Sequence, residues 1–322
     1  MKRREFIALV GGVATWPLAA RAQQRALPLV GILGPQPNSV PFGDAIVAGL
    51  RELGYVGGQN IRIEARWSDG RFERLPGLAA DLARLNVDVL VTSLTQATLA
   101  AKQTTTTIPI VMAGVGDPVG AGLINSLSRP GGNVTGTASL IVDIVGKQLE
   151  LLKEISPGVK RVAVLWNPAN SVFQNLQLRE MEVAARAVGV ELQLLEASTP
   201  KDFGLAFDRI ARERIRALAV LGDPLFSANA DIIAQSAASL VTVSNNRAMA
   251  EAGILITYGP SLLGLHKRVS VYVDKILKGA GPSDLPVEQP TTFELIVNLK
   301  AARTLGIVVP PTLLSRADEV IE

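Results

Sequence analysis

The feature that most constrains the fold is a series of short apolar segments, each followed by an amphipathic stretch, that occurs twice along the chain. The first series lies at residues 27–33, 61–65, 87–91, 108–113 and 134–138, and the second at 162–166, 191–195, 217–221, 240–243 and 253–257. These segments are rich in Val and Ile without strict alternation, which is typical of strands buried in a parallel sheet. The first and third segments lie about 60 residues apart in one series and about 56 in the other. The pattern predicts an α/β protein with two doubly wound parallel-sheet lobes.

Helices are expected between the apolar segments, because the intervening stretches repeat apolar residues every three or four positions. The expected helices cover residues 40–54, 72–85, 95–103 and 118–127 in the first series, and 171–188, 202–213, 227–237 and 245–251 in the second. Beyond both series we expect a helix at 261–278, an extended segment at 285–290 and a short helix near 297–305.

The N-terminus has the composition of an export signal. Two adjacent arginines precede an apolar run of about 14 residues, which ends in Ala20-Arg21-Ala22. This arrangement predicts a twin-arginine-like signal peptide at residues 1–22, with an ordinary export signal that happens to carry two arginines as the alternative. Either signal predicts a mature protein in the periplasm. Removing it takes away four of the 32 basic and one of the 29 acidic residues, so that 28 of each sign remain. The basic character of the chain thus belongs to the signal, and no later segment is long and apolar enough for a membrane helix.

Two residue counts exclude whole classes of site. The chain has no cysteine, and its one histidine is His266. Disulfides, thiolate metal sites and histidine-cluster zinc sites are therefore excluded, and we expect neither a metal nor another cofactor.

Sequence motifs also argue against catalysis and DNA binding. A Gly-x-Ser-x-Gly motif and a phosphate-binding P-loop are both missing, and His266 falls inside an expected helix. We therefore expect no enzyme. We also expect no nucleic-acid partner, because the mature chain is neutral and leaves no room for a DNA-binding headpiece before the first strand. A carbohydrate-active enzyme with paired carboxylates stays an alternative, since the separation of such groups in space does not follow from the sequence.

Polar residues follow several of the expected strands. In α/β sheets ligands bind beyond the carboxyl ends of the strands, where helix N-termini converge. Asp117 and Asp223 are suited to an ammonium group, and Ser93 and Thr95, with helix N–H groups, to a carboxylate. The same residue types are also ordinary helix caps. The predicted ligand-binding residues are Gln36, Ser93, Thr95, Asp117, Asn167, Asn170, Asp223, Asn245 and Tyr258.

Several segments together resemble a known family. They are residues 116–123, 129–136 (RPGGNVTG), 274–279 (DKILKG), 285–290 (LPVEQP) and the tail 316–322 (RADEVIE). The chain resembles the tryptophan/tyrosine-type substrate-binding proteins of ABC transporters, which have the type I periplasmic-binding fold.

The resemblance implies a hinge of three crossings between the lobes, near 138–142, 257–261 and 283–290. The first lobe would then hold residues 27–138 and about 261–283, and the second lobe residues 142–257 and about 290–322. It also implies a membrane permease and its ATPase as partners. Lipid-anchored members carry a cysteine after the signal, which this chain lacks, so we expect a soluble protein without a membrane anchor. We also expect a monomer.

The expected function follows from this organisation. We expect a periplasmic solute-binding protein that captures a small polar ligand, an amino acid or a related compound, and delivers it to an ABC-type permease. A sensor protein that presents its ligand to a membrane receptor is the other reading that the sequence leaves open.

Overall fold

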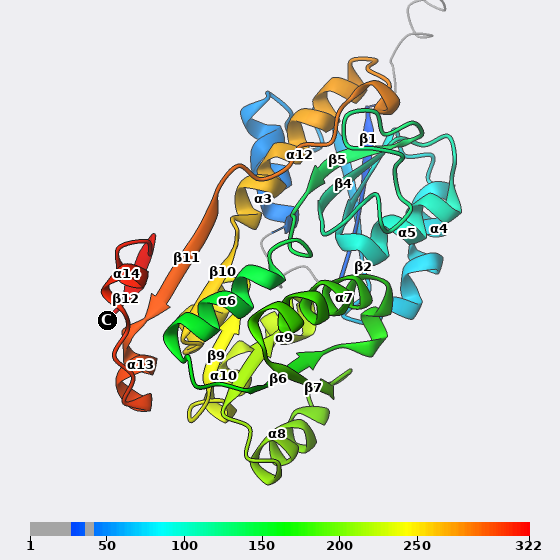
Figure 1. Ribbon diagram of the computed structural model, residues 1–322. Helices are drawn as coiled ribbons and strands as arrows, with labels where there is room; N and C mark the ends of the chain where they lie inside the picture. Colours follow the sequence, from blue (N-terminus) through cyan, green and yellow to red (C-terminus); the bar gives the residue numbers. More distant parts are fainter. Residues whose placement is uncertain (1–26, 36–41) are drawn as a thin grey trace, which may run out of the picture.

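The computed structural model describes residues 27–35 and 42–322, with the backbone alone for Leu262 and Leu263. The predicted signal peptide at 1–22 and the predicted site residue Gln36 lie outside the described residues. Within this part of the chain, no helix has both the length and the apolar character required to cross a membrane. The elements form two β-sheets with helices on both faces of each, as Figure 1 shows. The predicted α/β fold class with two lobes is confirmed.

The first sheet is entirely parallel, in the order β2-β1-β3-β4-β5. Its strands are β1 (Leu29–Gly34), β2 (Arg62–Trp67), β3 (Val89–Ser93), β4 (Ile110–Val115) and β5 (Val134–Ala138). Successive side chains of a strand point to opposite faces, so each face has its own core. Val30 and Ile32 of β1 pack toward α3 (Phe42–Glu52) and α12 (Leu262–Leu277). Leu29 and Leu33 pack on the opposite face toward α4 (Leu75–Arg84) and α5 (Leu94–Thr104).

The second sheet has the order β12-β11-β10-β9-β8-β6-β7, and its pairings are parallel except that β10 and β11 are antiparallel. Its strands are β6 (Arg161–Trp166), β7 (Glu191–Glu196), β8 (Ala217–Val220), β9 (Val241–Ser244), β10 (Ile256–Pro260), β11 (Phe293–Asn298) and β12 (Glu319–Ile321). The sequence patterns did not predict β11 and β12, which lengthen this sheet beyond a simple copy of the first.

Helices cover both faces of the second sheet. One core packs α6 (Val145–Ile155) and α7 (Ser171–Val188) on the sheet, and the other packs α8 (Asp202–Arg212) and α10 (Ala230–Ser236) on the opposite face. The remaining helices are α9 (Pro224–Ala228), α11 (Arg247–Ala252), α13 (Leu299–Leu305) and α14 (Pro311–Leu314).

The chain passes between the two sheets three times. It leaves β5 to enter α6, leaves β10 to enter α12 beside α3, and returns after the short turn η3 (Pro282–Asp284) to β11. The returning strand segment lies against β5, where the Ala138 N–H donates to the Glu288 carbonyl at 2.8 Å and the Glu288 N–H donates to Gly136 at 3.0 Å. Arg268 of α12 also forms an ion pair with the Glu288 carboxylate at 2.6 Å. The first lobe is therefore fastened to the segment that leads back into the second.

One expected helix is absent from the described residues, and one observed helix was not expected. The predicted helix at 118–127 is a series of turns, because the Asp117 carboxylate accepts the Gly120 N–H at 2.8 Å and Gly122 adopts a left-handed φ of 69°. The helix α6 was not predicted, although Val145, Leu149 and Leu152 give it the apolar stripe of a packed helix.

Candidate functional site

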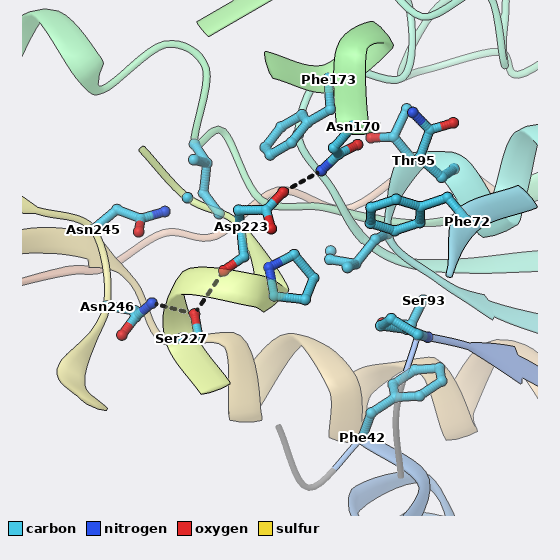
Figure 2. A pocket seen from close by; sticks show the side chains of 18 of the residues that line it. Phe42, Phe72, Ser93, Thr95, Asn170, Phe173, Asp223, Ser227, Asn245 and Asn246 are labelled. Carbon is cyan, nitrogen blue, oxygen red and sulfur yellow. Dashed lines mark hydrogen bonds between the residues drawn. The ribbon is translucent and has the colours of Figure 1, made fainter. Parts of the chain in front are cut away.

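A cavity, partly open to solvent, lies where the carboxyl ends of strands from both sheets face one another (Figure 2). Its lining comes from the segments after β1, β3 and β4 of the first sheet and after β6, β8 and β9 of the second, with contributions from η1 (Phe72–Arg74), α12 and a crossing. The lining residues are Pro35, Phe42, Phe72, Ser93, Leu94, Thr95, Gln96, Gly114, Gly116, Ile141, Asn170, Phe173, Gly222, Asp223, Pro224, Ser227, Asn245, Asn246 and His266.

Asp223 is the buried acid of this cavity, and its side chain is only 4% exposed. It follows β8 and caps α9, where its Oδ1 accepts the Leu225 N–H at 2.8 Å. The same carboxylate accepts the Asn167 amide at 3.1 Å and the Asn170 amide at 2.8 Å. Burial raises the pKa of the Asp223 carboxyl above its ordinary value, and these hydrogen bonds limit the rise. The side chain is held in place and retains room for another charge-assisted hydrogen bond.

Two further acceptors lie beside Asp223. Asn170 donates its amide N–H to Asp223, so the Oδ1 of Asn170 points away from that hydrogen bond. Neither Asn170 Oδ1 nor Asn245 Oδ1 has a hydrogen-bond partner among the described residues. Figure 2 shows Asp223 between Asn170 and Asn245. A Cβ at Gly222 would stand 2.3 Å from Asn245 Nδ2, so the glycine makes room for this amide. Buried acceptors without a partner are costly, and a bound donor would satisfy them.

A second layer of side chains forms hydrogen bonds that hold the segment around Asp223 in place. Gln174 of α7 donates to the Gly222 carbonyl at 2.9 Å, and Gln177 also donates to it at 3.3 Å. On the other side of Asp223, Asn246 donates to the Ser227 hydroxyl at 2.8 Å, which in turn donates to the Asp223 carbonyl at 3.1 Å (Figure 2). Because both glutamines are fully buried, the loop after β8 is fixed before any ligand arrives.

The first lobe contributes a helix N-terminus. Ser93 ends β3, and α5 begins at Leu94 with a left-handed φ of 69°. Within the described part of the chain, the Ser93 side chain accepts no hydrogen bond from the first turn of α5, so those N–H groups remain available at the cavity. The positive end of the helix dipole and these donors suit an anionic group.

Three phenylalanines contribute aromatic rings to the apolar part of the lining, which also includes Pro35, Leu94, Ile141 and Pro224. Phe42 starts α3, Phe72 starts η1 after β2, and Phe173 lies in the first turn of α7. Figure 2 places Phe72 beside Thr95, Phe42 beside Ser93 and Phe173 above Asn170. None of the three was predicted from the sequence, although each lies near the start of a helix that follows a strand.

Phe173 also joins the two lobes. A Cβ built on Gly116, which follows β4 in the first sheet, would stand 2.1 Å from Phe173 Cε2 of α7 in the second lobe. The absence of a side chain at Gly116 therefore lets the lobes approach one another here.

The predicted site residues have different placements. Five of them, Ser93, Thr95, Asn170, Asp223 and Asn245, line the cavity, and Asn167 supports Asp223 from behind. Asp117 lies outside the lining and caps the turn at Gly120. Tyr258 also lies outside, because β10 extends to Pro260, and its ring stacks on Phe293 with centroids 5.8 Å apart. Gln36 is outside the described residues.

Comparison with known proteins identifies relatives over most of the chain. The tyrosine-binding protein of Clostridioides difficile (strain R20291) is 26% identical over 263 residues, which cover 81% of this chain and 75% of that protein. A structure described as an ABC domain in complex with L-Trp, from Streptococcus pneumonia, is 26% identical with a TM-score of 0.81. This match covers 92% of this chain and 100% of the other.

A ligand-free, open structure of a substrate binding protein from Clostridium difficile is also 26% identical and covers 92% of this chain and 99% of that one, with a TM-score of 0.65. At equal identity, this structure therefore resembles the L-Trp complex more closely than the open form.

The sequence profile of the ABC transporter substrate binding proteins matches residues 40–321. Proteins of this family bind solutes and are not enzymes, which agrees with the expectation of a binding protein. The partners that the family implies are a small-molecule ligand and an ABC transporter. The chain belongs to the family of ABC transporter substrate binding proteins.

Proposed function

We propose that this protein captures a free α-amino acid with a large apolar or aromatic side chain between its lobes and delivers it to the permease of an ABC transporter. The observation that carries this proposal is the buried carboxylate of Asp223, with the unpartnered oxygens of Asn170 and Asn245 on the same wall. An ammonium group has three N–H donors and one positive charge, so it matches this set of acceptors.

The other end of the ligand is a carboxylate. It would lie at the N-terminus of α5, where Ser93 leaves the first N–H groups of the helix free and Thr95 adds a hydroxyl. A helix N-terminus alone is a weak indication of an anion site. In this protein the helix N-terminus and Asp223 line the same cavity, so one zwitterion would place its carboxylate at the helix and its ammonium group at Asp223.

The ligand side chain would pack among the phenylalanine rings. Phe42, Phe72 and Phe173 give the cavity the apolar surface expected of a site for a bulky side chain. The names of the tyrosine-binding relative and of the L-Trp complex support the same class of ligand for this chain.

Transport also needs an exported protein and a membrane partner. We extend the proposal to a periplasmic monomer that is exported by the twin-arginine-like signal at 1–22 and that docks on a permease with a cytoplasmic ATPase. N-terminal sequencing of the exported protein is expected to begin near Gln23.

A thermal-shift screen of the mature protein with all proteinogenic amino acids, sugars and inorganic anions tests the ligand class. A ligand at 100 times its Kd stabilises the folded state by about 2.7 kcal/mol, so a cognate amino acid raises Tm by several degrees. The Asp223→Asn variant is expected to lose that shift. A response to sugars or anions alone would contradict the proposal.

A further inference from the structure

His266 is a buried polar side chain that the amino-acid anchors described above do not use. It lies in α12 and lines the cavity with 2% of its surface exposed. Its ring meets the edge of Phe42, with centroids 5.1 Å apart and an interplanar angle of 74°. Neither imidazole nitrogen has a hydrogen-bond partner in the described part of the chain.

Other buried polar groups on the same helix do have partners. Ser270, one turn along α12, donates its hydroxyl to the Lys267 carbonyl at 2.8 Å. Asp274 accepts the Tyr55 hydroxyl at 3.0 Å and pairs with Lys278. His266 differs from both in that it lines the cavity and its nitrogens have no hydrogen-bond partner among the described residues. An apolar side chain would pack against Phe42 without the cost of about 1–3 kcal/mol that an unpaired buried polar group carries.

The chemistry of His266 is that of a neutral imidazole. Burial lowers the pKa of His266 to about 4, so the ring is uncharged at neutral pH. A neutral imidazole has one N–H donor and one acceptor nitrogen. Such a group can form a hydrogen bond with an uncharged polar atom of a ligand. It would not attract a carboxylate as a charged imidazolium would.

We infer that His266 is a specificity-determining residue that forms a hydrogen bond with a polar atom on the ring of an aromatic amino acid. This inference rests on the proposed function, in which Asp223 anchors the ammonium group and the phenylalanines surround the side chain. The ligand class is thereby narrowed to aromatic amino acids that carry a ring hydroxyl or ring N–H. A site built to form such a bond rejects the hydrocarbon analogue more strongly than a pocket selects by size.

Two pairs of ligands test the role of His266 in the mature protein by titration calorimetry. L-tyrosine and L-phenylalanine differ by one hydroxyl, and 3-(3-benzothienyl)-L-alanine has the fused ring shape of L-tryptophan with sulfur in place of the ring N–H. The wild-type protein is expected to prefer the polar member of at least one pair by about 10-fold or more. His266→Phe is expected to bring that ratio close to one, and His266→Gln, which keeps a donor and an acceptor, to retain part of it. Ser270→Ala is the matched control, because Ser270 is buried in α12 outside the lining, and it is expected to leave the ratio unchanged.

The outcomes separate this inference from the proposed function. Equal affinities within both pairs for the wild-type protein, which require no folded variant, would overturn the role of His266 and leave amino-acid binding intact. A preference that persists in a folded His266→Phe protein would overturn it as well. Absence of binding by all four aromatic amino acids would overturn this inference too, and the thermal-shift screen with all proteinogenic amino acids then decides separately whether the proposed function, on which the inference rests, also fails.

Discussion

The cavity wall built by the second lobe carries hydrogen-bond acceptors on buried side chains, whereas the wall built by the first lobe carries backbone donors and aromatic rings. Asp223 in the second lobe fills its own helix cap and is braced by Asn167 and Asn170. Ser93 in the first lobe leaves the cap of α5 open. Under the proposed function, a molecule with charge of both signs is bound completely only when both walls touch it, so we expect its binding to favour closure of the lobes.

The largest effect is expected when the negative charge of Asp223 is removed from the wall built by the second lobe. Asp223→Asn keeps the shape of the side chain and is expected to weaken amino-acid binding by about 30- to 5,000-fold, because losing one partner of a buried charge pair costs roughly 2–5 kcal/mol. Titration calorimetry measures the change. The matched control is Asp117→Asn, since Asp117 lies outside the lining, and it is expected to change Kd less than twofold. Equal losses in the two variants would contradict the assignment.

The next largest loss of affinity is expected from a variant that holds the two cavity walls apart. Gly116→Ala places a methyl group where Phe173 packs, and overpacking typically costs roughly 1–3 kcal/mol. We expect amino-acid affinity to fall by about 5- to 150-fold, with less ligand-induced compaction in small-angle scattering. Gly132→Ala is the control, because its Cβ would meet nothing within 4 Å. Normal compaction in Gly116→Ala would show that the Gly116–Phe173 contact does not govern closure.

The charge of the second wall also predicts a pH dependence. Burial raises the pKa of Asp223, and a bound ammonium group favours the ionised carboxylate, so binding lowers this pKa. Affinity is therefore highest above the raised pKa of the free protein. It falls by up to about 10-fold per pH unit as the pH drops through and below that value, until the pKa of the complex is reached. Calorimetry across this range is expected to show the fall in the wild-type protein and a flat profile in Asp223→Asn.

The smallest effect is expected outside the two walls. Tyr258→Phe removes a hydroxyl from a ring that stacks on Phe293 in the second sheet and does not line the cavity. We expect Kd to change less than twofold in calorimetry. A 10-fold or larger loss of affinity would contradict the placement of Tyr258 outside the ligand site.

The sequence predicted the polar part of the lining better than the apolar part, for a physical reason. Ser93 is the last residue of a buried strand, and Asn170, Asp223 and Asn245 lie in segments that follow such strands. Parallel strands bring these positions together at one edge of each sheet. Tyr258 was selected by the same rule, but the strand continues to Pro260 and its pleat turns the ring toward Phe293.

The apolar lining and His266 could not be found by that rule. Phe42, Phe72 and Phe173 lie at the starts of helices, where an aromatic residue reads as ordinary core. His266 reaches the cavity because α12 crosses back to the first lobe and packs beside α3. Sequence periodicity describes which face of a helix is apolar, but it does not say which distant loops that face will meet.

The most direct test of the central claim combines a variant with an altered ligand. The affinities of wild type and Asp223→Asn for L-tyrosine and for 3-(4-hydroxyphenyl)propionate, which lacks the ammonium group, form a double-mutant cycle in calorimetry. If Asp223 binds the ammonium group, removing either partner weakens binding strongly, and removing both costs little more than removing one. Losses that simply multiply would show that Asp223 and the ammonium group do not interact, and would contradict the account.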